Sequence, residues 1–289
     1  MSLGCVLENA VLAAAAYGFS SEVALSLDAR PLPTSATAPS LVHVATTRFT
    51  PGRRSENGES ELAAMKARKM VRAVFDEQVD LEPELGAELV EQVRALHDGL
   101  TLHLLTDAPT KIFLGKFQEL ADATVINRER FARELGAWFL PNDASSCFGM
   151  RGQEFGLADA AAKRMHLGLL GEGPLLPDET AGFAKVGNLG MRTSSAIGVI
   201  TVAEDDLEHR IAAGRAYQRL AIALVRAGFV TAMHAGITEV DGPNLALRGR
   251  LRTRRRPSVV FRMGKPVHPE DGARPHSSRP ALVDVLLHG

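Results

Sequence analysis

Two short segments combine arginine side chains with hydroxyl groups, a pairing that suits the recognition of phosphate. The first contains Arg48, Thr50 and Arg53, and the second, close to the end of the chain, contains Ser278 and Arg279. Arginine supplies fixed, charge-assisted hydrogen-bond donors that match phosphate oxygens or the electron-rich edge of a ring. Each segment therefore predicts an anion-binding role, and the competing interpretation of each is a solvated surface loop.

Other chemistries leave no motif in the sequence. It contains no G-x-S-x-G, Walker A, H-E-x-x-H or C-x-x-C segment, and its nine histidines are scattered. We therefore expect no metal site, and no residue is nominated as a catalytic acid or base. Two cysteines, Cys5 and Cys147, are too few for a disulfide framework, which predicts a reduced, cytoplasmic protein.

Composition bounds the fold and the partners. The chain has 289 residues, 45% hydrophobic and 23% charged, which is typical of a globular protein with one large domain or two small ones. The net charge is −1, but residues 248–279 carry about +8, which predicts an anionic ligand or a nucleic-acid patch. The arginine-rich run 248–256 has no aromatic residue, which disfavours nucleic acid.

The segment from Leu3 to Phe19 is strongly apolar. It has neither the basic flank of a signal peptide nor the length of a membrane span. It predicts a helix that is apolar nearly all round and therefore buried. Such a helix needs a cover, either from residues 41–289 or from a second chain. We therefore expect a two-fold homodimer and no membrane contact.

Helices and strands are mixed along the chain. Helical spacing predicts helices at 59–75 and 84–97, one or two helices at 110–139, an Ala-rich helix ending near 170, and a helix at 205–227. Apolar or alternating runs predict strands at 22–27, 101–105, 196–202 and 258–263. The glycine-containing segment 171–195 predicts a loop, and 28–40 predicts a linker. This order of elements predicts the α+β class.

The sequence matches itself at an offset of 210 residues. Gly4, Ala13, Gly18 and Phe19 are identical to their partners at 214, 223, 228 and 229. One interpretation is a duplicated module, of which the first copy is represented only by its end. The other is a chance likeness between two Ala-rich helices that end in glycine.

Four segments in this order resemble the flavin-dependent nitroreductase family, in particular its fused two-repeat, Acg-like branch. They are 48–53 (RFTPGR), 127–138 (NRERFARELGAW), 213–228 (AGRAYQRLAIALVRAG), and 257–266 (PSVVFRMGKP) with the tail residues 278–280 and 284–286. The first resembles the R-x-[ST]-x-[RK] segment that binds FMN. The last resembles the closing strand and the tail that reaches the FMN phosphate.

The resemblance implies a nitroreductase-like α+β fold with a mixed, mostly antiparallel sheet flanked by helices. Residues 1–40 would be the remnant of a first repeat that lacks its start, and 41–289 a nitroreductase-like domain. In the site it implies, Arg48 stabilises negative charge on the flavin ring or phosphate, and Thr50 holds the phosphate with Arg53 in the same segment. Ser278 and Arg279 clamp the phosphate from the other end of the chain.

The resemblance also implies an activity. FMN would accept a hydride from NAD(P)H and pass electrons to a small-molecule acceptor, a nitroaromatic or a quinone. A flavin-binding or flavin-sequestering protein without turnover is the alternative. A yellow protein would distinguish both from a nucleic-acid-binding protein, and NAD(P)H oxidation would distinguish the enzyme from the sequestering protein.

Overall fold

A four-stranded antiparallel sheet organises the chain. The computed structural model describes residues 1–26, 42–146 and 148–273. Within them the strand order is β3 (Leu100–Leu105), β6 (Ala196–Val202), β8 (Arg256–Gly264) and β7 (Val230–Met233), with each neighbouring pair antiparallel. The predicted α+β class and mostly antiparallel sheet are confirmed, as are the strands at β3, β6 and β8.

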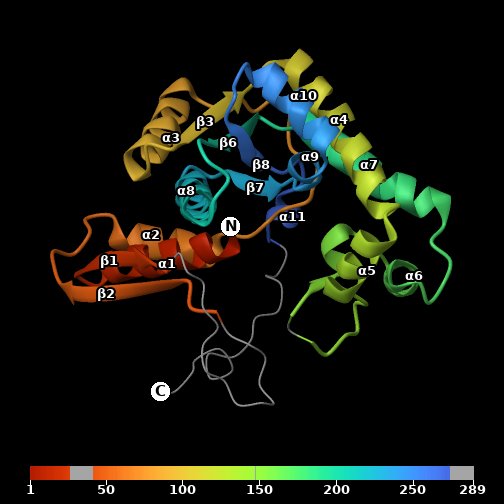
Figure 1. The fold of residues 1–289 in the computed structure, drawn as a ribbon, viewed down its shortest axis with the longest axis horizontal. Helices are drawn as coiled ribbons and strands as arrows, with labels where there is room; N and C mark the ends of the chain where they lie inside the picture. Colours follow the sequence, from red (N-terminus) through yellow and green to blue (C-terminus); the bar gives the residue numbers. More distant parts are fainter. Residues whose placement is uncertain (27–41, 147, 274–289) are drawn as a thin grey trace.

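The side chains of β6 alternate between two cores because successive residues of a strand face opposite sides of the sheet. Ile200 and Val202 pack with α3 (Pro83–Leu96) and α8 (Leu207–Arg226). Ile197 and Val199 pack with α4 (Ala108–Ile126), α7 (Pro177–Arg192) and α10 (Asp241–Leu251) on the other side. In Figure 1 the sheet accordingly lies between α8 and the pair of α4 and α7.

The first helix, α1 (Ser2–Ala16), packs against α8 and lies below it in Figure 1. Its buried residues form one stripe at a spacing of four: Gly4, Glu8, Leu12 and Ala16. The expectation of a helix buried nearly all round is wrong, because Leu3, Val6 and Tyr17 are exposed. The stripe is covered by α8 and α2 (Gly58–Ala67) of the same chain. The homodimer therefore stays a prediction that the burial of this helix does not require.

The two helices meet through reciprocal contacts. Arg219 Nε donates to Glu8 Oε1 at 2.7 Å, and Gln218 Nε2 donates to Asn9 Oδ1 at 2.7 Å. Gln218 lies 210 residues after Glu8, and Asn9 lies 210 residues before Arg219. The internal offset therefore relates the first pair to the second, with the two helices exchanged. The same exchange relates two further neighbouring pairs: Cys5 Sγ donates to Gly214 O at 3.3 Å, and a Cβ added at Gly4 would lie 2.8 Å from Arg215 N. The internal match at this offset thus coincides with a local pseudo-two-fold arrangement.

Each of these helices is followed by a glycine and then by a strand that pairs antiparallel with a later strand. Gly18 has a φ of +84° and Gly228 a φ of +78°, a region that glycine occupies without steric penalty. After Gly18, β1 (Phe19–Leu25) pairs along its full length with β2 (Ala45–Pro51). After Gly228, β7 pairs with β8. The β1–β2 pairing joins residues on both sides of the expected boundary at residue 40.

The segment after α2 is extended, so the predicted helix at 59–75 is wrong for its second half. Met70 forms a parallel bridge with Thr231, and Phe75 forms an antiparallel bridge with Pro266. Val71 N donates to Thr231 O at 3.0 Å. Bonds to the sheet edge replace the bonds that a helix would make, so tertiary pairing overrides the local pattern. This segment brings Arg72 and Phe75 to the end of the sheet.

The predicted loop at 171–195 is also wrong, since most of it is the helix α7. Gly187 of α7 and Gly115 of α4 allow close packing between the two helices. A Cβ added at Gly187 would lie 2.5 Å from Asp122 Oδ2, and one added at Gly115 would lie 2.5 Å from Asn188 Oδ1. The two helices can approach only because these positions have no side chain.

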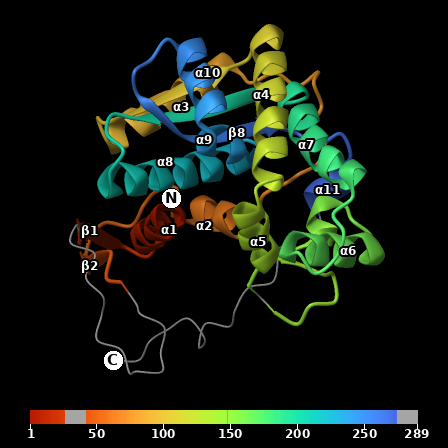
Figure 2. The ribbon, with the colours of Figure 1, turned by 45° about the vertical axis from the view of Figure 1, so that its right-hand side comes forward.

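A small lobe extends from the ends of α4 and α7 (Figure 2). It contains α5 (Glu129–Trp138), β4 (Phe139–Leu140), β5 (Met150–Arg151), the 3₁₀ helix η1 (Gly152–Phe155) and α6 (Asp159–Leu170). Its own core includes Ala132, Phe139, Met165 and Leu169. The predicted region 110–139 is thus two helices, and the Ala-rich helix ending at 170 is confirmed.

After α8, four elements have no counterpart among the predicted ones: β7, α9 (Gly236–Glu239), α10 and α11 (Pro269–Ala273). Three of them are five residues or shorter, which is too short for a periodic pattern to appear. The fourth, α10, contains Gly242, Pro243 and Gly249, residues that favour turns.

The turn after α10 contains a strained residue that yields a stability prediction. Arg252 has a φ of +51°, and it is the one non-glycine residue with positive φ in the described ranges. A left-handed conformation costs an L-residue about 1–2 kcal/mol, and glycine pays about 0.5–1 kcal/mol in chain entropy. We expect Arg252→Gly to raise the free energy of unfolding by about 0.5–1 kcal/mol in urea titrations. Arg254 does not have a positive φ, so Arg254→Gly should lower the free energy of unfolding. A lower free energy of unfolding in both variants would contradict the proposed strain at Arg252.

Candidate functional site

Three of the predicted site residues lie on or just after the β1–β2 hairpin. Arg48 lies opposite Glu22 in the strand pair, and Thr50 follows two residues later. The side chains of Arg48, Thr50 and Arg53 are all exposed. Arg53 Nη2 donates to Glu56 Oε1 at 2.7 Å, in an ion pair that is itself exposed. None of these three side chains lines the hollow between β1 and α8 described below, so their role stays a prediction.

The other predicted pair, Ser278 and Arg279, lies outside the described residues, in 274–289. Cys147 lies outside them as well. The expectation that the chain end clamps a phosphate therefore stays a prediction.

The arginine-rich run at 248–256 is partly engaged within the chain. Arg255 Nη1 donates to Gly99 O at 2.7 Å, and Arg250 Nε donates to Thr110 Oγ1 at 3.0 Å. Side chains that bind their own fold are less available for phosphate groups. This arrangement further disfavours the nucleic-acid interpretation.

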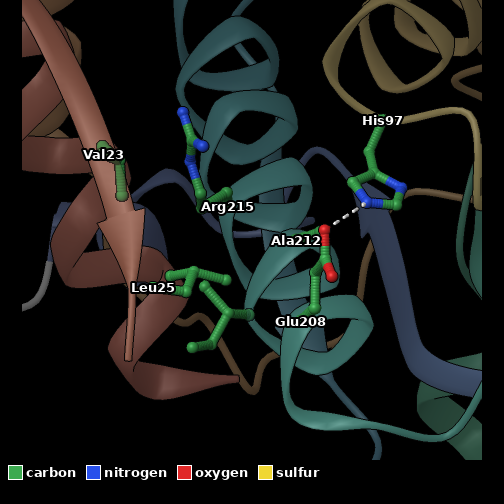
Figure 3. A pocket seen from close by; sticks show the side chains of 7 residues that line it. Val23, Leu25, His97, Glu208, Ala212 and Arg215 are labelled. Atoms are coloured by element: carbon green, nitrogen blue, oxygen red, sulfur yellow. Dashed lines mark ion pairs between the residues drawn. The ribbon is translucent and has the colours of Figure 1, made fainter. Parts of the chain in front are cut away.

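A hollow of about 300 Å³ lies between β1 and the first turns of α8 (Figure 3). Its lining combines apolar side chains with three polar ones: Val23, Leu25, Ile211, Ala212, His97, Glu208 and Arg215. Figure 3 shows His97 paired with Glu208, whose facing atoms are 3.7 Å apart. Arg215 donates from Nε to Glu8 at 2.9 Å. The polar groups of the hollow thus have partners, and none demands a ligand.

A different arrangement lies at the end of the sheet, where we define the buried cation cluster as Arg72, His234 and Arg262, with the rings of Phe75 and Phe155. Arg262 belongs to β8 and is 3% exposed. One face of its guanidinium lies over the Phe75 ring, 3.9 Å from the centroid. A Cβ added at Gly190 would lie 2.8 Å from its Nε, so only glycine leaves room there.

Three polar atoms in this cluster have no hydrogen-bond partner among the described residues. Arg262 Nη2 donates to Ala73 O at 2.7 Å, but its Nε and Nη1 are buried without a hydrogen-bond partner among the described residues. His234, the residue after β7, donates its backbone N–H to Val260 O at 2.9 Å. Its Nε2 is likewise buried and has no partner in that part of the chain. Buried polar atoms are normally paired, so three exceptions in one place require an explanation.

The pKa values of the cluster also show that its positive charges are unfavourably placed in the protein alone. Burial, followed by the charge of Arg72, lowers the pKa of Arg262 to about 9. Burial, followed by the charges of Arg262 and Arg72, lowers the pKa of His234 to about 3, so its imidazole is neutral at neutral pH. The two arginines, Arg72 and Arg262, and the neutral His234 therefore lie together with little negative charge near them.

The lobe reaches this cluster through Arg72. The Arg72 guanidinium lies over the Phe155 ring, 4.3 Å from the centroid, and its Nη2 contacts Met150 Sδ at 3.7 Å. The Glu154 carboxylate is 3.9 Å from Arg72 Nη1, at the outer limit of an ion pair. Burial lowers the pKa of Arg72, and the charge of Glu154 acts in the opposite direction.

A buried carboxyl group lies behind the loop that carries His234. Gln118 Nε2 donates to Asp122 Oδ1 at 2.7 Å, and Ile237 N donates to Gln118 Oε1 at 3.3 Å. A Cβ added at Gly236 would lie 2.6 Å from Asp122 Oδ1. Burial raises the pKa of Asp122 to about 7, with Glu239 acting in the same direction and Gln118 against it. This carboxyl group therefore titrates near neutral pH.

The sequence holds one signal for this cluster. Arg262 interrupts the apolar run of β8, SVVFRM, and a charged residue inside a buried strand indicates a partner or a ligand. Arg72 and Phe75 gave no signal, because their segment has helical spacing and its extended conformation depends on pairing with β7. No group of three or more His, Cys, Asp or Glu side chains in the described ranges is arranged to hold a metal ion.

Comparisons with known proteins identify the fold. No protein-family model and no curated protein matches the sequence. Among solved structures, the FMN-dependent nitroreductase NfnB from Mycobacterium smegmatis, in complex with NADPH, is 13% identical, with a TM-score of 0.50. The match covers 81% of this chain and 100% of that one. At this identity the likeness shows the fold alone, which is a nitroreductase-like α+β fold as expected.

Two further structures are similar at lower scores. A nitroreductase with bound FMN from Desulfitobacterium hafniense is 9% identical with a TM-score of 0.48, over 80% of this chain and 98% of that one. A nitroreductase-like protein from Streptococcus mutans is 12% identical with a TM-score of 0.46, over 80% and 98%. No helix of the described part is long and apolar enough to cross a membrane.

Proposed function

We propose that this protein is an FMN-dependent NAD(P)H oxidoreductase of the nitroreductase type, reducing a nitroaromatic or a quinone. The observation that supports it most is the fold likeness to an FMN-dependent nitroreductase over 81% of the chain. Because fold alone does not determine function, the proposal also needs a site that suits the cofactor.

The buried cation cluster suits an anionic, planar cofactor. Arg262 and His234 have buried nitrogens without a partner in the described part of the chain, and such nitrogens match a ligand that carries negative charge. Phe75 and Phe155 add aromatic surface beside the two arginines. From the sequence motifs we retain Arg48, Thr50 and Arg53 on one side, with Ser278 and Arg279 at the chain end. For Arg53 to take part, its ion pair with Glu56 has to open.

The chemistry would come from the cofactor, which accepts a hydride from NAD(P)H and passes electrons to the acceptor. The chain's own share is binding and electrostatics. Arg262 and Arg72 would stabilise negative charge, and the cover over Arg72 by Met150 and Phe155 would exclude water.

The depth of the cluster supports the alternative, flavin binding without turnover. Arg262 and the Nε2 atom of His234 are buried, and the Phe155 ring of the lobe covers one face of Arg72. A cofactor held there would meet a second substrate only if the lobe moved. Oxidation of NAD(P)H by the flavin-loaded protein separates the two functions.

The reciprocal contacts of α1 and α8 support the proposal of two related repeats, one represented by residues 1–40 and the other by residues 41–289. In this arrangement α1 takes the place on α8 that the same helix of a second module would take. A homodimer would then use another surface, and the exposed side chains of Leu3 and Val6 on α1, and of Tyr17 just after it, are available for it.

The cofactor prediction is tested by loading the protein with FMN and recording its visible spectrum and flavin fluorescence. We expect a bound flavin spectrum and NAD(P)H oxidation in the presence of a nitroaromatic or a quinone. Arg279→Ala should weaken FMN binding about ten- to a hundredfold, the loss of one charge-assisted hydrogen bond. Arg254→Ala, an exposed arginine of the same basic region, should change nothing. A protein that takes up no FMN overturns the proposed function.

A further inference from the structure

One edge of the β1–β2 hairpin has no strand beside it in the described part of the chain. β1 pairs with β2 along its other edge, and the two strands form a sheet of their own. Ser21, which lies on β1, has a buried Oγ atom without a hydrogen-bond partner among the described residues. An open strand edge presents unpaired backbone N–H and C=O groups, which native proteins normally pair or cover. This edge is therefore a place where a further strand can add.

The corresponding edge of β7 does have a partner. β7 follows α8 as β1 follows α1, and Thr231 lies 210 residues after Ser21. The extended segment 68–75 runs beside β7: Met70 forms a parallel bridge with Thr231, and Val71 N donates to Thr231 O at 3.0 Å. The pseudo-two-fold relation of α1 and α8 therefore predicts a parallel segment beside β1 as well.

The hollow beside β1 lies where such a segment would run. Val23 and Leu25 line it from β1, and Arg215 is among the residues that line it from α8 (Figure 3). In the corresponding place between β7 and the start of α1, burial raises the pKa of the Cys5 thiol and the charge of Arg68 acts against it. Cys5 lies 210 residues before Arg215, so the segment that begins at Arg68 runs through the counterpart of the hollow.

The sequence that follows α11 resembles the segment that follows α2. α2 begins at Gly58 and α11 at Pro269, 211 residues later. At this offset 68–75 (RKMVRAVF) falls on 279–286 (RPALVDVL), which lies outside the described residues. The first and seventh positions are identical, and the third, fourth and eighth are apolar in both segments. The end of the chain is thus the sequence counterpart of the segment beside β7.

We propose that the free edge of β1 and the hollow beside it are the docking site of residues 279–286 of the same chain, which add to β1 as a parallel strand. Ala281 lies opposite Ser21, as Met70 lies opposite Thr231. The added strand is the outermost one, and an outer strand tolerates the missing N–H of Pro280. This docking goes beyond the proposed function, because it requires no cofactor.

The alternation of side chains along the added strand fits the hollow. Opposite residues of paired strands point to the same face, and successive residues point to opposite faces. Val283 and Val285 therefore join Val23 and Leu25 in the hollow, whose surface there is apolar. Asp284 points to the other face and reaches water. A strand in this register buries its valines and leaves its one charged side chain solvated.

Hydrogen exchange at the β1 amides of the full chain, without flavin, tests the docking. Alternate amides of β1 bond to β2, and the others point to the free edge. We expect these edge amides to be protected in the parent and to exchange about tenfold faster or more in Val283→Asp, which places a charge in the hollow. Leu282→Asp, on the outer face, is the matched control and should exchange as the parent does. Unprotected edge amides in the parent, or equal exchange in the parent and Val283→Asp, overturn the proposal.

A cysteine pair tests the register and the chain of origin. Ser21→Cys and Ala281→Cys are combined with Cys5→Ser and Cys147→Ser. Paired strands lie about 4.8 Å apart, a separation that a disulfide spans. We expect oxidation to form an intramolecular disulfide at every protein concentration. The control pairs Ser21→Cys with His288→Cys, about 23 Å further along an extended strand, and should give about a tenth of the yield or less. Absence of the disulfide, or a disulfide-linked dimer that increases with concentration, overturns docking within one chain.

Discussion

Gly4→Ala is expected to lower the free energy of unfolding by about 3 kcal/mol, although alanine is the better helix former. An added Cβ would meet Ile211 O of α8 and lie 2.8 Å from Arg215 N. These are backbone atoms inside a helix, so they cannot move aside as a flexible side chain can. The two helices would have to separate, which strains the buried contacts of Glu8 with Arg215 and Arg219. Denaturant unfolding followed by circular dichroism measures the loss.

The matched control for this variant is Gly182→Ala. Gly182 lies inside α7, and a Cβ there meets nothing within 4 Å. The same substitution should therefore raise stability by about 0.5–1 kcal/mol, the helix-propensity gain. We therefore expect the free energy of unfolding to fall in Gly4→Ala and to rise in Gly182→Ala. A Gly4→Ala protein as stable as the parent would contradict the close contact between α1 and α8.

Asp122→Asn is expected to stabilise the protein at alkaline pH. The pKa of Asp122 is raised from 3.8 to about 7, mainly by burial, so the folded state prefers the protonated acid. A difference of about three pKa units corresponds to about 4 kcal/mol at most, at 1.36 kcal/mol per unit. Asparagine keeps an oxygen that accepts from Gln118 Nε2 and carries no charge to bury.

The sign of the pH dependence follows from the raised pKa. The contribution of Asp122 to stability is fully present below its unfolded pKa and is lost as the pH rises toward about 7. The gain of Asp122→Asn over the parent should therefore be small at pH 4, grow to about pH 7 and level off above it. Asp80→Asn, an exposed carboxylate, should show no such trend. The test is to measure the free energy of unfolding of the parent and of Asp122→Asn at pH 4, 6 and 8. A difference between the two proteins that does not change with pH would contradict a buried, protonated Asp122.

Much of the fold could be predicted from local patterns. The β6 segment is a continuous run of small and β-branched apolar residues, and α3 places Leu89 and Val93 on one face, so each pattern reports its own burial. The prediction of a loop at 171–195 was wrong because Gly182, Gly187 and Gly190 are typical of loops, whereas in the structure they lie in α7. Two of these glycines allow backbone approach to α4 and to Arg262, which is a property of the partner and not of the segment.

The candidate site was less predictable for the same reason. Arg72 comes from a segment whose conformation depends on β7, Phe155 comes from the lobe, and His234 follows a strand of four residues. These residues lie far apart in the sequence and share no spacing. The sequence favoured Arg48, Thr50 and Arg53 because their spacing is local, whereas the buried donors come together only in the folded chain.

The position of α8 has a consequence for how the molecule opens. Its Ala213, Tyr217 and Leu220 belong to the core of the sheet, while its Ile222 packs with Leu12 and Ala64 on the opposite side. The helix thus contributes side chains to two cores. If one core unfolded alone, α8 would expose its apolar side chains on that side to water. Hydrogen exchange at the α8 amides should proceed only through global unfolding, and α1 should act as a cooperative part of the whole chain.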